Sequence, residues 1–316
     1  MLAVLAAILA FFFLAPLFME VYYLSVLRNS LLLAALTMSW FFFSGTTRYV
    51  SLGSAAFFGT GLYFTALYLE QSVLSKHLPV LPLPLLMLMA GLLNFAIAFV
   101  VGLISLRLKG MHFAVATFAL GVACRGIFDY VVSDFMGTYY THIPPFSPEV
   151  TYYTITVTAL AIFLFVFVLY RSKLGLALRL IGENEEVAAH LGVNTSLVKT
   201  LGFAVSSMCI GFTGSCYATI FTVTSPKLAF DYQFSFLPPM MAMFGGLGLF
   251  YAPLIGAMAL SLLRELLGVT LVHYFLLTLG AIIVLIAKFV PEGVVVFLKR
   301  RLEVGLGGRL GRLSSS

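Results

Sequence analysis

Charged residues are scarce in this sequence. Lys, Arg, Asp and Glu make up 9% of the 316 residues, whereas hydrophobic residues make up 61%. An ordinary soluble domain carries about 25% charged residues, so this chain lacks the polar side chains to cover a water-facing surface. The composition therefore predicts an integral membrane protein, which we expect to be all-α and polytopic.

Cysteines and metal-ligand patterns are also sparse. Of the three cysteines, Cys209 and Cys216 share a helix face but lie about 10 Å apart along its axis, too far for a disulfide. The five histidines show no metal-ligand spacing, and no Gly-Lys-Ser/Thr follows the glycine-rich stretch near residue 245. We therefore expect no catalytic site, no metal and no cofactor bound by this chain.

Lysine and arginine are absent before Arg28, so the basic region of a cleavable signal peptide is missing and residues 1–19 are expected to stay as a span.

A span needs about 20 mainly apolar residues. About ten stretches qualify, of which the eighth and ninth are short, so a broken or re-entrant element is the alternative there. The ten are 1–19, 23–44, 50–69, 81–106, 112–132, 151–170, 200–222, 233–249, 251–269 and 272–290.

The basic residues orient these spans. The net charge is +6, but the basic side chains mostly sit beside apolar spans, so a positive-inside bias explains them better than nucleic-acid binding. Seven charges fall between Arg171 and Lys199, which places segment 171–199 in the cytoplasm, whereas loop 133–150 has no Lys or Arg. Both termini are then cytoplasmic. We expect a transmembrane domain over 1–290 and a basic tail over 291–316, either at the anionic inner leaflet or disordered.

The charged segment contains the stretch GENEEVAAHLG, residues 182–192. Three glutamates at its start suit the positive end of a helix dipole, and Gly192 suits a left-handed cap. We predict a helix of about nine residues between Gly182 and Gly192, with a small apolar face of Val187, Ala188 and Leu191. Nine residues do not hold a helix alone in water. The segment is therefore either an ordinary solvated loop helix or a docking element for a soluble partner.

This stretch resembles the cytoplasmic coupling segment of the LivM-type permease subunits of branched-chain amino-acid ABC importers. The similarity continues through Lys199, Phe203 and Ser206 to Ala218. It implies that a cytoplasmic ATPase subunit grips this helix and that small residues allow its close approach. The implied ATPase-coupling residues are Gly182, Glu183, Asn184, Glu185, Glu186, Ala188, Ala189, Leu191 and Gly192.

Other stretches resemble the same family. One of them is SLGSAAFFGTGLY, residues 51–63. Just before it the chain departs from the family, which usually has a small residue where Arg48 stands. Residues 107–125 also resemble the family, and Arg125 matches the family's arginine, but Val122 stands where the family has a glutamate. We suggest that Asp129, one turn beyond Arg125, pairs with this arginine instead. Close packing alone is the alternative for the glycine-rich stretches. The residues implied for the translocation path or its packing are Ser51, Gly53, Phe57, Gly59, Gly61, Arg125, Asp129, Gly245 and Gly246.

The resemblance implies a multi-pass subunit of an importer in a bacterial or archaeal inner membrane. Its partners would be a second permease subunit in a heterodimer, two ATPase subunits that bind ATP and Mg, an external binding protein and membrane lipid. The implied substrates are branched-chain or related hydrophobic amino acids, with urea or amides, aromatic acids and nucleosides as alternatives. An ion-coupled secondary transporter is the rival class, but only Asp129 lies well inside a span.

Overall fold

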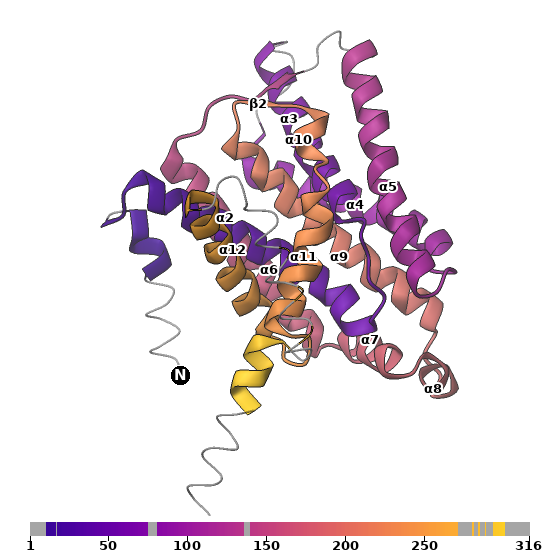
Figure 1. The fold of residues 1–316 in the computed structure, drawn as a ribbon. Coiled ribbons are helices and arrows are strands. Elements are labelled where there is room, and N and C mark those ends of the chain that lie inside the picture. Colours follow the sequence, from indigo (N-terminus) through magenta and orange to yellow (C-terminus); the bar gives the residue numbers. More distant parts are fainter. Residues whose placement is uncertain are drawn as a thin grey trace, which may run out of the picture.

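The computed structural model describes residues 11–16, 18–74, 81–135, 140–270 and 293–300, with isolated positions at 280, 284 and 288. Within these residues the chain is almost wholly helical, as predicted (Figure 1). In chain order the elements are α2 (Val21–Trp40), η1 (Phe41–Gly45), α3 (Ser54–Leu74), α4 (Leu83–Ser105), α5 (Met111–Tyr130), η2 (Val131–Phe135), β1 (Thr141–His142), α6 (Pro148–Arg171), α7 (Lys173–Glu183), α8 (Glu185–His190), α9 (Thr195–Tyr217), η3 (Ala218–Ile220), β2 (Val223–Thr224), α10 (Pro226–Ala229), α11 (Gln233–Gly245) and α12 (Ala252–Thr270).

Five of the described helices are long and apolar enough to cross a membrane. They are Val21–Gly45, Leu83–Ser105, Met111–Asp134, Pro148–Arg171 and Thr195–Ile220. α3, α11 and α12 lie where further spans are predicted, while most of 1–19 and 272–290 falls outside the described residues. The chain is thus a multi-pass membrane protein, and the total of ten spans stays a prediction.

α11 is short for a span. Its 13 residues rise about 20 Å, against about 30 Å of hydrocarbon. It ends at Gly245, and the next residue, Gly246, has a φ of 107°, a left-handed conformation that favours glycine. A Cβ at Gly245 would lie 2.0 Å from the carbonyl oxygen of Ala252, so α11 and α12 cross closely here. The predicted roles of Gly245 and Gly246 in a tight turn between short elements agree with this geometry.

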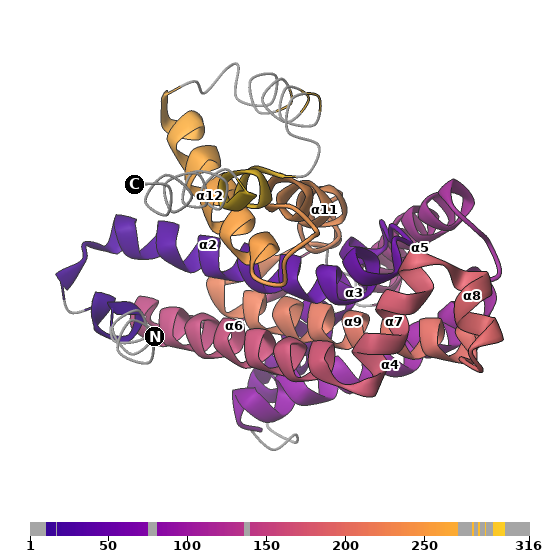
Figure 2. The ribbon, with the colours of Figure 1, turned by 90° about the horizontal axis from the view of Figure 1, so that it is seen from below.

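α9 lies at the centre of the helix bundle and packs against α3, α4, α2 and α6 (Figure 2). Glycines make its contact with α3 close, because a Cβ at Gly61 would lie 2.1 Å from the carbonyl oxygen of Gly211. A Cβ at Gly59 would lie 2.4 Å from the ring of Phe230, and a Cβ at Gly53 would lie 3.2 Å from the carbonyl oxygen of Thr117. The predicted small-residue packing is therefore confirmed.

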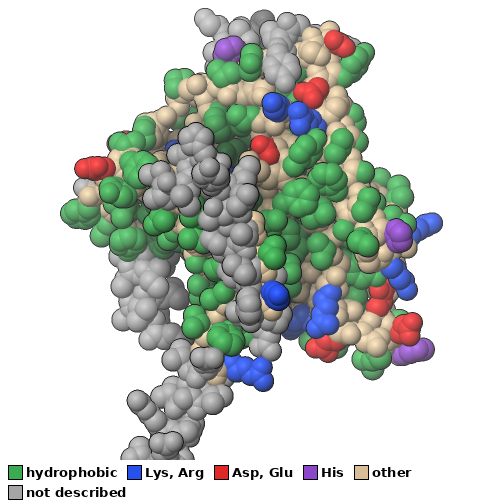
Figure 3. Space-filling view, viewed as in Figure 1, with side chains coloured by type: hydrophobic (Ala, Val, Ile, Leu, Met, Phe, Trp, Pro, Cys, Tyr) green, Lys and Arg blue, Asp and Glu red, His purple; other side chains and the backbone are tan. Residues whose placement is uncertain are grey.

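The two ends of the bundle carry different elements. β1 pairs with β2 in a small antiparallel sheet, with Thr141 opposite Thr224, and this sheet lies at the end opposite α7 and α8 (Figure 1). In Figure 3, charged side chains gather at the upper end of the visible face and around its lower right, while hydrophobic side chains cover much of the middle. This distribution suits a protein whose middle lies in lipid. Cys124, Cys209 and Cys216 are free, as expected.

Candidate functional site

The charged segment folds as two helices rather than one. α7 begins after Ser172, whose Oγ accepts a hydrogen bond from the Gly175 amide, and continues through Glu183. The side chain of Asn184 then accepts hydrogen bonds from the Glu186 and Val187 amides at 3.0 and 3.1 Å and starts α8. The predicted helix start directly after Gly182 is therefore wrong, because the extended backbone of Asn184 (φ −158°) separates Glu183 from α8.

The predicted C-terminal cap is confirmed. Gly192 has φ of 86°, and the amide of Val193 donates to the carbonyl oxygen of Ala188 at 3.1 Å. This six-residue closure is the Schellman arrangement, in which a glycine takes the left-handed position after the helix. It turns the chain toward Asn194, which caps α9 by accepting a hydrogen bond from the Leu197 amide at 3.1 Å. α8 is thus fixed by caps at both ends.

Gly182 packs directly against the connection between η1 and α3, residues 46–53. A Cβ at Gly182 would lie 2.0 Å from the carbonyl oxygen of Thr46 and 3.2 Å from the Cα of Thr47. No larger residue fits without moving one of the two backbones. The last turn of α7 is therefore in close contact with this connection.

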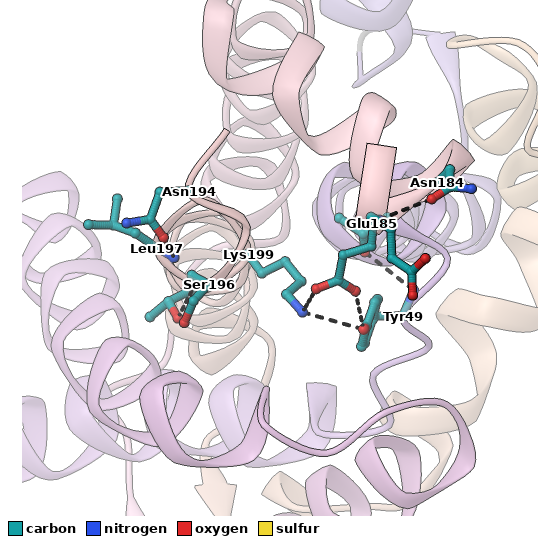
Figure 4. Close-up of polar contacts among 10 residues, drawn as sticks. Tyr49, Asn184, Glu185, Asn194, Ser196, Leu197 and Lys199 are labelled. Carbon is teal, nitrogen blue, oxygen red and sulfur yellow. Dashed lines mark hydrogen bonds and ion pairs between the residues drawn. The ribbon is translucent and has the colours of Figure 1, made fainter. Parts of the chain in front are cut away.

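A second contact joins the same connection to α8 and α9. The Tyr49 hydroxyl donates to Glu185 Oε2 at 2.6 Å, and Lys199 Nζ donates to Glu185 Oε1 at 2.5 Å and to the Tyr49 hydroxyl at 3.3 Å (Figure 4). Lys199 Nζ also lies 4.6 Å from the centre of the Tyr49 ring. We call Tyr49, Glu185 and Lys199 the coupling cluster. It ties three segments that are distant in sequence to one another.

The coupling cluster is shielded from water. The Lys199 side chain is 5% exposed and that of Glu185 is 26% exposed. Burial raises the pKa of Glu185, but hydrogen bonds from Lys199 and Tyr49 and the charge of Lys199 outweigh it, so the pKa lies below its ordinary value. Burial, followed by the hydrogen bond to Glu185, raises the pKa of Tyr49. Glu185 is therefore ionised and Tyr49 is a neutral donor at neutral pH.

The lowered pKa of Glu185 predicts how the cluster responds to acid. A carboxyl whose pKa is lower in the folded state stabilises that state above its unfolded pKa and loses this effect as pH falls through the folded pKa. We expect the difference in melting temperature between the native protein and Glu185→Gln to be constant from pH 7 down to about 4.3, the ordinary value for Glu, and to shrink below it. Melting curves in detergent from pH 7 to 3 test this. A difference that grew in acid would contradict it.

Part of the segment remains uncovered. Leu176 on α7, Val187 on α8 and Leu191 after it are 53%, 53% and 68% exposed, and Glu183, Glu186 and Ala189 are exposed beside them. Ala188, by contrast, is 1% exposed and packs inside the chain. Exposed apolar side chains on a charged, water-facing segment are typical of a protein-binding surface. Of the two alanines, only Ala189 is accessible to a partner.

The predicted residues of segment 51–63 hold the connection in place. The backbone of Ser51 accepts a hydrogen bond from Trp40 Nε1 at 2.8 Å and donates one to Ser44 Oγ at 3.2 Å. Ser51 Oγ accepts from the Gly53 amide at 3.3 Å, and Phe57 packs edge-on against Phe203 of α9. The connection that contacts α7 and α8 is therefore held by α2 and η1, and the start of α3 packs against α9.

Arg125 and Asp129 form the ion pair suggested by their spacing. Arg125 Nε lies 3.7 Å from Asp129 Oδ2, with the two side chains 25% and 37% exposed. The guanidinium also lies 5.6 Å from the centre of the Tyr232 ring, which precedes α11. The pair sits far from the coupling cluster, because Phe113, twelve residues before Arg125 and about 18 Å along α5, is the residue that contacts Tyr49.

Arg48 is the single non-glycine residue with a positive φ (61°) in the described part of the chain. A side chain costs about 1 kcal/mol in this left-handed region, where glycine is free of the penalty. We therefore expect Arg48→Gly to raise the free energy of unfolding by up to about 1 kcal/mol. The gain is reduced because glycine increases the conformational entropy of the unfolded chain. Thermal unfolding measures the gain. Arg48→Ala keeps a Cβ and is the control, and an equal gain in that variant would exclude backbone strain as the cause.

Comparison with known proteins places the chain in one family. Residues 22–287 match the family described as "Branched-chain amino acid transport system / permease component". The chain belongs to this family. The match covers α2 through α12 and includes both the coupling cluster and the Arg125–Asp129 pair.

Two relatives carry the same printed name, "High-affinity branched-chain amino acid transport system permease protein LivM". The protein of Salmonella typhimurium strain LT2 is 25% identical over 328 residues, which cover 90% of this chain and 74% of the relative. The protein of Escherichia coli strain K12 is 28% identical over 143 residues, which cover 45% and 33%. No solved structure matches the chain.

Metal and cofactor sites were not expected. Among the described residues, no group of three or more His, Cys, Asp or Glu side chains is arranged to hold a metal ion.

Tyr49 was missing from the predicted site, and its role had no sequence signal, because 136 residues separate it from Glu185. Lys199 was noted within the family pattern but not as a partner of Glu185.

Proposed function

We propose that the chain is the permease subunit of an ATP-driven importer and forms half of the path for branched-chain or related hydrophobic amino acids. Membership of the permease family supports the transport role. The substrate class rests on the names of the two LivM relatives. The single observation that carries the ATP-driven mechanism is the coupling cluster, which joins a surface helix to the core of the bundle.

The ATPase would act on this chain through α7 and α8. An ATPase subunit docks on the exposed apolar and acidic surface of Leu176, Val187, Ala189 and Leu191. When the ATPases close on ATP, a displacement of α8 moves Glu185, and Glu185 moves Lys199 on α9 and Tyr49 on the connection. Gly182 transmits the same displacement through its contact with Thr46. The chain contributes gating rather than bond chemistry, and ATP and Mg belong to the partner subunits.

The second permease subunit would cover one side of α5. Apolar side chains along this helix are exposed, but exposure alone does not separate lipid from protein. The Arg125–Asp129 pair indicates protein or water rather than lipid on its side of α5. Both side chains are partly exposed, and an ion pair that faces hydrocarbon is costly. We therefore propose that this side of α5 faces the translocation path and the partner permease. The exposed residues on the same side of α5 as the pair are Val115 and Val122.

Reconstitution tests the proposed function. The chain, a second permease, two ATPase subunits and a binding protein encoded with it are purified together, placed in proteoliposomes and supplied with labelled leucine. Uptake that needs ATP inside and the binding protein outside supports the proposal. Uptake that follows an ion gradient without ATP would overturn it in favour of a secondary transporter.

Crosslinking tests the docking surface separately. Ala189→Cys lies on the exposed face of α8, and Ser133→Cys is an exposed control on η2, past the far end of α5. We expect Ala189→Cys, and not Ser133→Cys, to crosslink to an ATPase subunit. Failure at Ala189, or equal crosslinking at both positions, would contradict docking through α8.

A further inference from the structure

A partly enclosed cavity of about 440 Å³ lies between α2, α11, α12 and the end of α9. This volume is within the range of small-molecule sites. On α2 the lining runs from Val26 to Leu33. Leu33 precedes Thr46, the contact of Gly182, by 13 residues, or about 20 Å of helix. The cavity therefore lies in the half of the bundle away from the coupling cluster, which is the outer half in the proposed orientation.

Charges of both signs line this cavity. Arg264 and Glu265 come from α12, and Asp231 comes from the turn before α11. Arg264 Nη2 donates to Gln233 Oε1 at 2.9 Å, which holds α12 beside the start of α11. Tyr22 donates to Glu265 Oε1 at 3.3 Å, and Asp231 Oδ1 accepts from the Gln233 amide at 2.8 Å. Each charged group is thus held by a neutral partner.

The opposite charges do not neutralise one another. Across the described residues, ion pairs within 4 Å form at Arg125–Asp129 and Lys199–Glu185, and none joins Arg264 to Asp231 or Glu265. A guanidinium has five N–H donors in a planar fork that matches a carboxylate, and the one hydrogen bond of the Arg264 side chain within the described chain uses a single nitrogen. Donors and acceptors therefore remain for a ligand that carries both charges.

Apart from Asn29, Ser30 and Ser261, most of the remaining lining is apolar and suits an aliphatic side chain. Leu33 of α2 and Phe234 and Leu237 of α11 are each less than a tenth exposed and line the same cavity. A fatty acid would leave the two carboxylates without a cation, and an amine would leave the guanidinium without an anion. An aliphatic α-amino acid supplies a carboxylate, an ammonium and an apolar group within one small molecule.

We propose that this cavity is a transient binding site for a zwitterionic aliphatic amino acid on its way through the permease. The guanidinium of Arg264 takes the carboxylate, Asp231 and Glu265 take the ammonium, and the leucine-lined wall takes the side chain. The inference rests on the proposed function and adds to it a place of contact within this chain. It also makes the permease itself selective, in addition to the binding protein.

Initial rates of leucine uptake in proteoliposomes that hold the whole complex test the site. Arg264→Gln removes the cation and is expected to slow uptake at least about tenfold, the effect of losing one charge-assisted hydrogen bond. Arg264→Lys keeps the charge and should recover part of the rate. The control is Lys227→Gln, which removes an exposed basic residue on α10 that does not line the cavity, and it should transport at the native rate.

Gln233→Glu separates binding from a structural role of Arg264. It places a carboxylate on the existing partner of Arg264, which strengthens their contact and occupies the guanidinium. If Arg264 binds substrate, Gln233→Glu slows uptake as Arg264→Gln does, while the melting temperature does not fall. Native uptake by Gln233→Glu or by Arg264→Gln would overturn the site and leave the importer function standing. A native complex that takes up no amino acid with ATP would overturn both.

Discussion

Replacing Glu185 with glutamine is expected to abolish most ATP-driven uptake. The substitution keeps an acceptor for the Tyr49 hydroxyl but leaves the ammonium of Lys199, 5% exposed, without a counter-charge. Loss of one member of a buried ion pair costs about 3–5 kcal/mol, and because Glu185 is a quarter exposed we expect a value near the lower end. If a cost of about 3 kcal/mol falls on the conformational change that drives transport, uptake slows by about a hundredfold. Uptake in proteoliposomes measures the loss of transport, and the melting temperature in detergent measures the loss of stability.

A double substitution separates stability from coupling. Lys199→Met removes the unpaired charge, so Glu185→Gln combined with Lys199→Met should melt at a higher temperature than Glu185→Gln alone. Uptake should stay low in the double variant, because α8 no longer binds α9 through the cluster. Glu186→Gln is the control for stability, since the exposed Glu186 carboxylate has no partner among the described residues. Full recovery of uptake in the double variant would show that the cluster only stabilises the fold.

Gly61→Ala is expected to destabilise the bundle strongly. A methyl group at this position would lie 2.1 Å from the carbonyl oxygen of Gly211, a backbone atom that has no rotamer to escape into. α3 and α9 would have to separate, and overpacking of this kind costs about 3 kcal/mol or more. The loss should appear as a lower yield of monodisperse protein and a lower melting temperature.

Gly126→Ala is the matched control for this prediction. Gly126 also lies within a helix, α5, but a Cβ there would meet no heavy atom within 4 Å. Alanine favours a helix by up to about 1 kcal/mol over glycine, so this variant should be as stable as the native protein or slightly more so. Equal destabilisation at both positions would show that the close approach of α3 to α9 is not the cause.

The sequence was informative wherever a property is local. Apolar length placed the long helices between α2 and α12, and the disagreements at their ends, of up to five residues, reflect fraying and capping. Gly192 as a left-handed cap followed from its residue type and position, and Asp129 as the partner of Arg125 followed from the family resemblance and the i+4 spacing. In each case the interacting groups lie within one or two helical turns.

The error at Gly182 has a physical reason. The helix was predicted to lie between two glycines, Gly182 and Gly192, whereas the missing side chain of Gly182 allows close contact with the Thr46 backbone. The actual boundary is Asn184, a residue type that strongly favours helix starts. Contacts such as Gly182 with Thr46 and Tyr49 with Glu185 join segments more than 130 residues apart, so no local pattern reports them.

α9 connects two parts of the molecule that have been described separately. Near its first turn it carries Lys199 of the coupling cluster, and its last residue, Tyr217, lines the cavity that holds Arg264. Its 23 residues form a rod of roughly 35 Å. A stiff rod turns a small angular movement at one end into a displacement at the other, so a tilt of roughly 5° would shift Tyr217 by roughly 3 Å. A movement of the coupling cluster at one end of α9 would then change the shape of the cavity at the other end, because one rigid helix joins them.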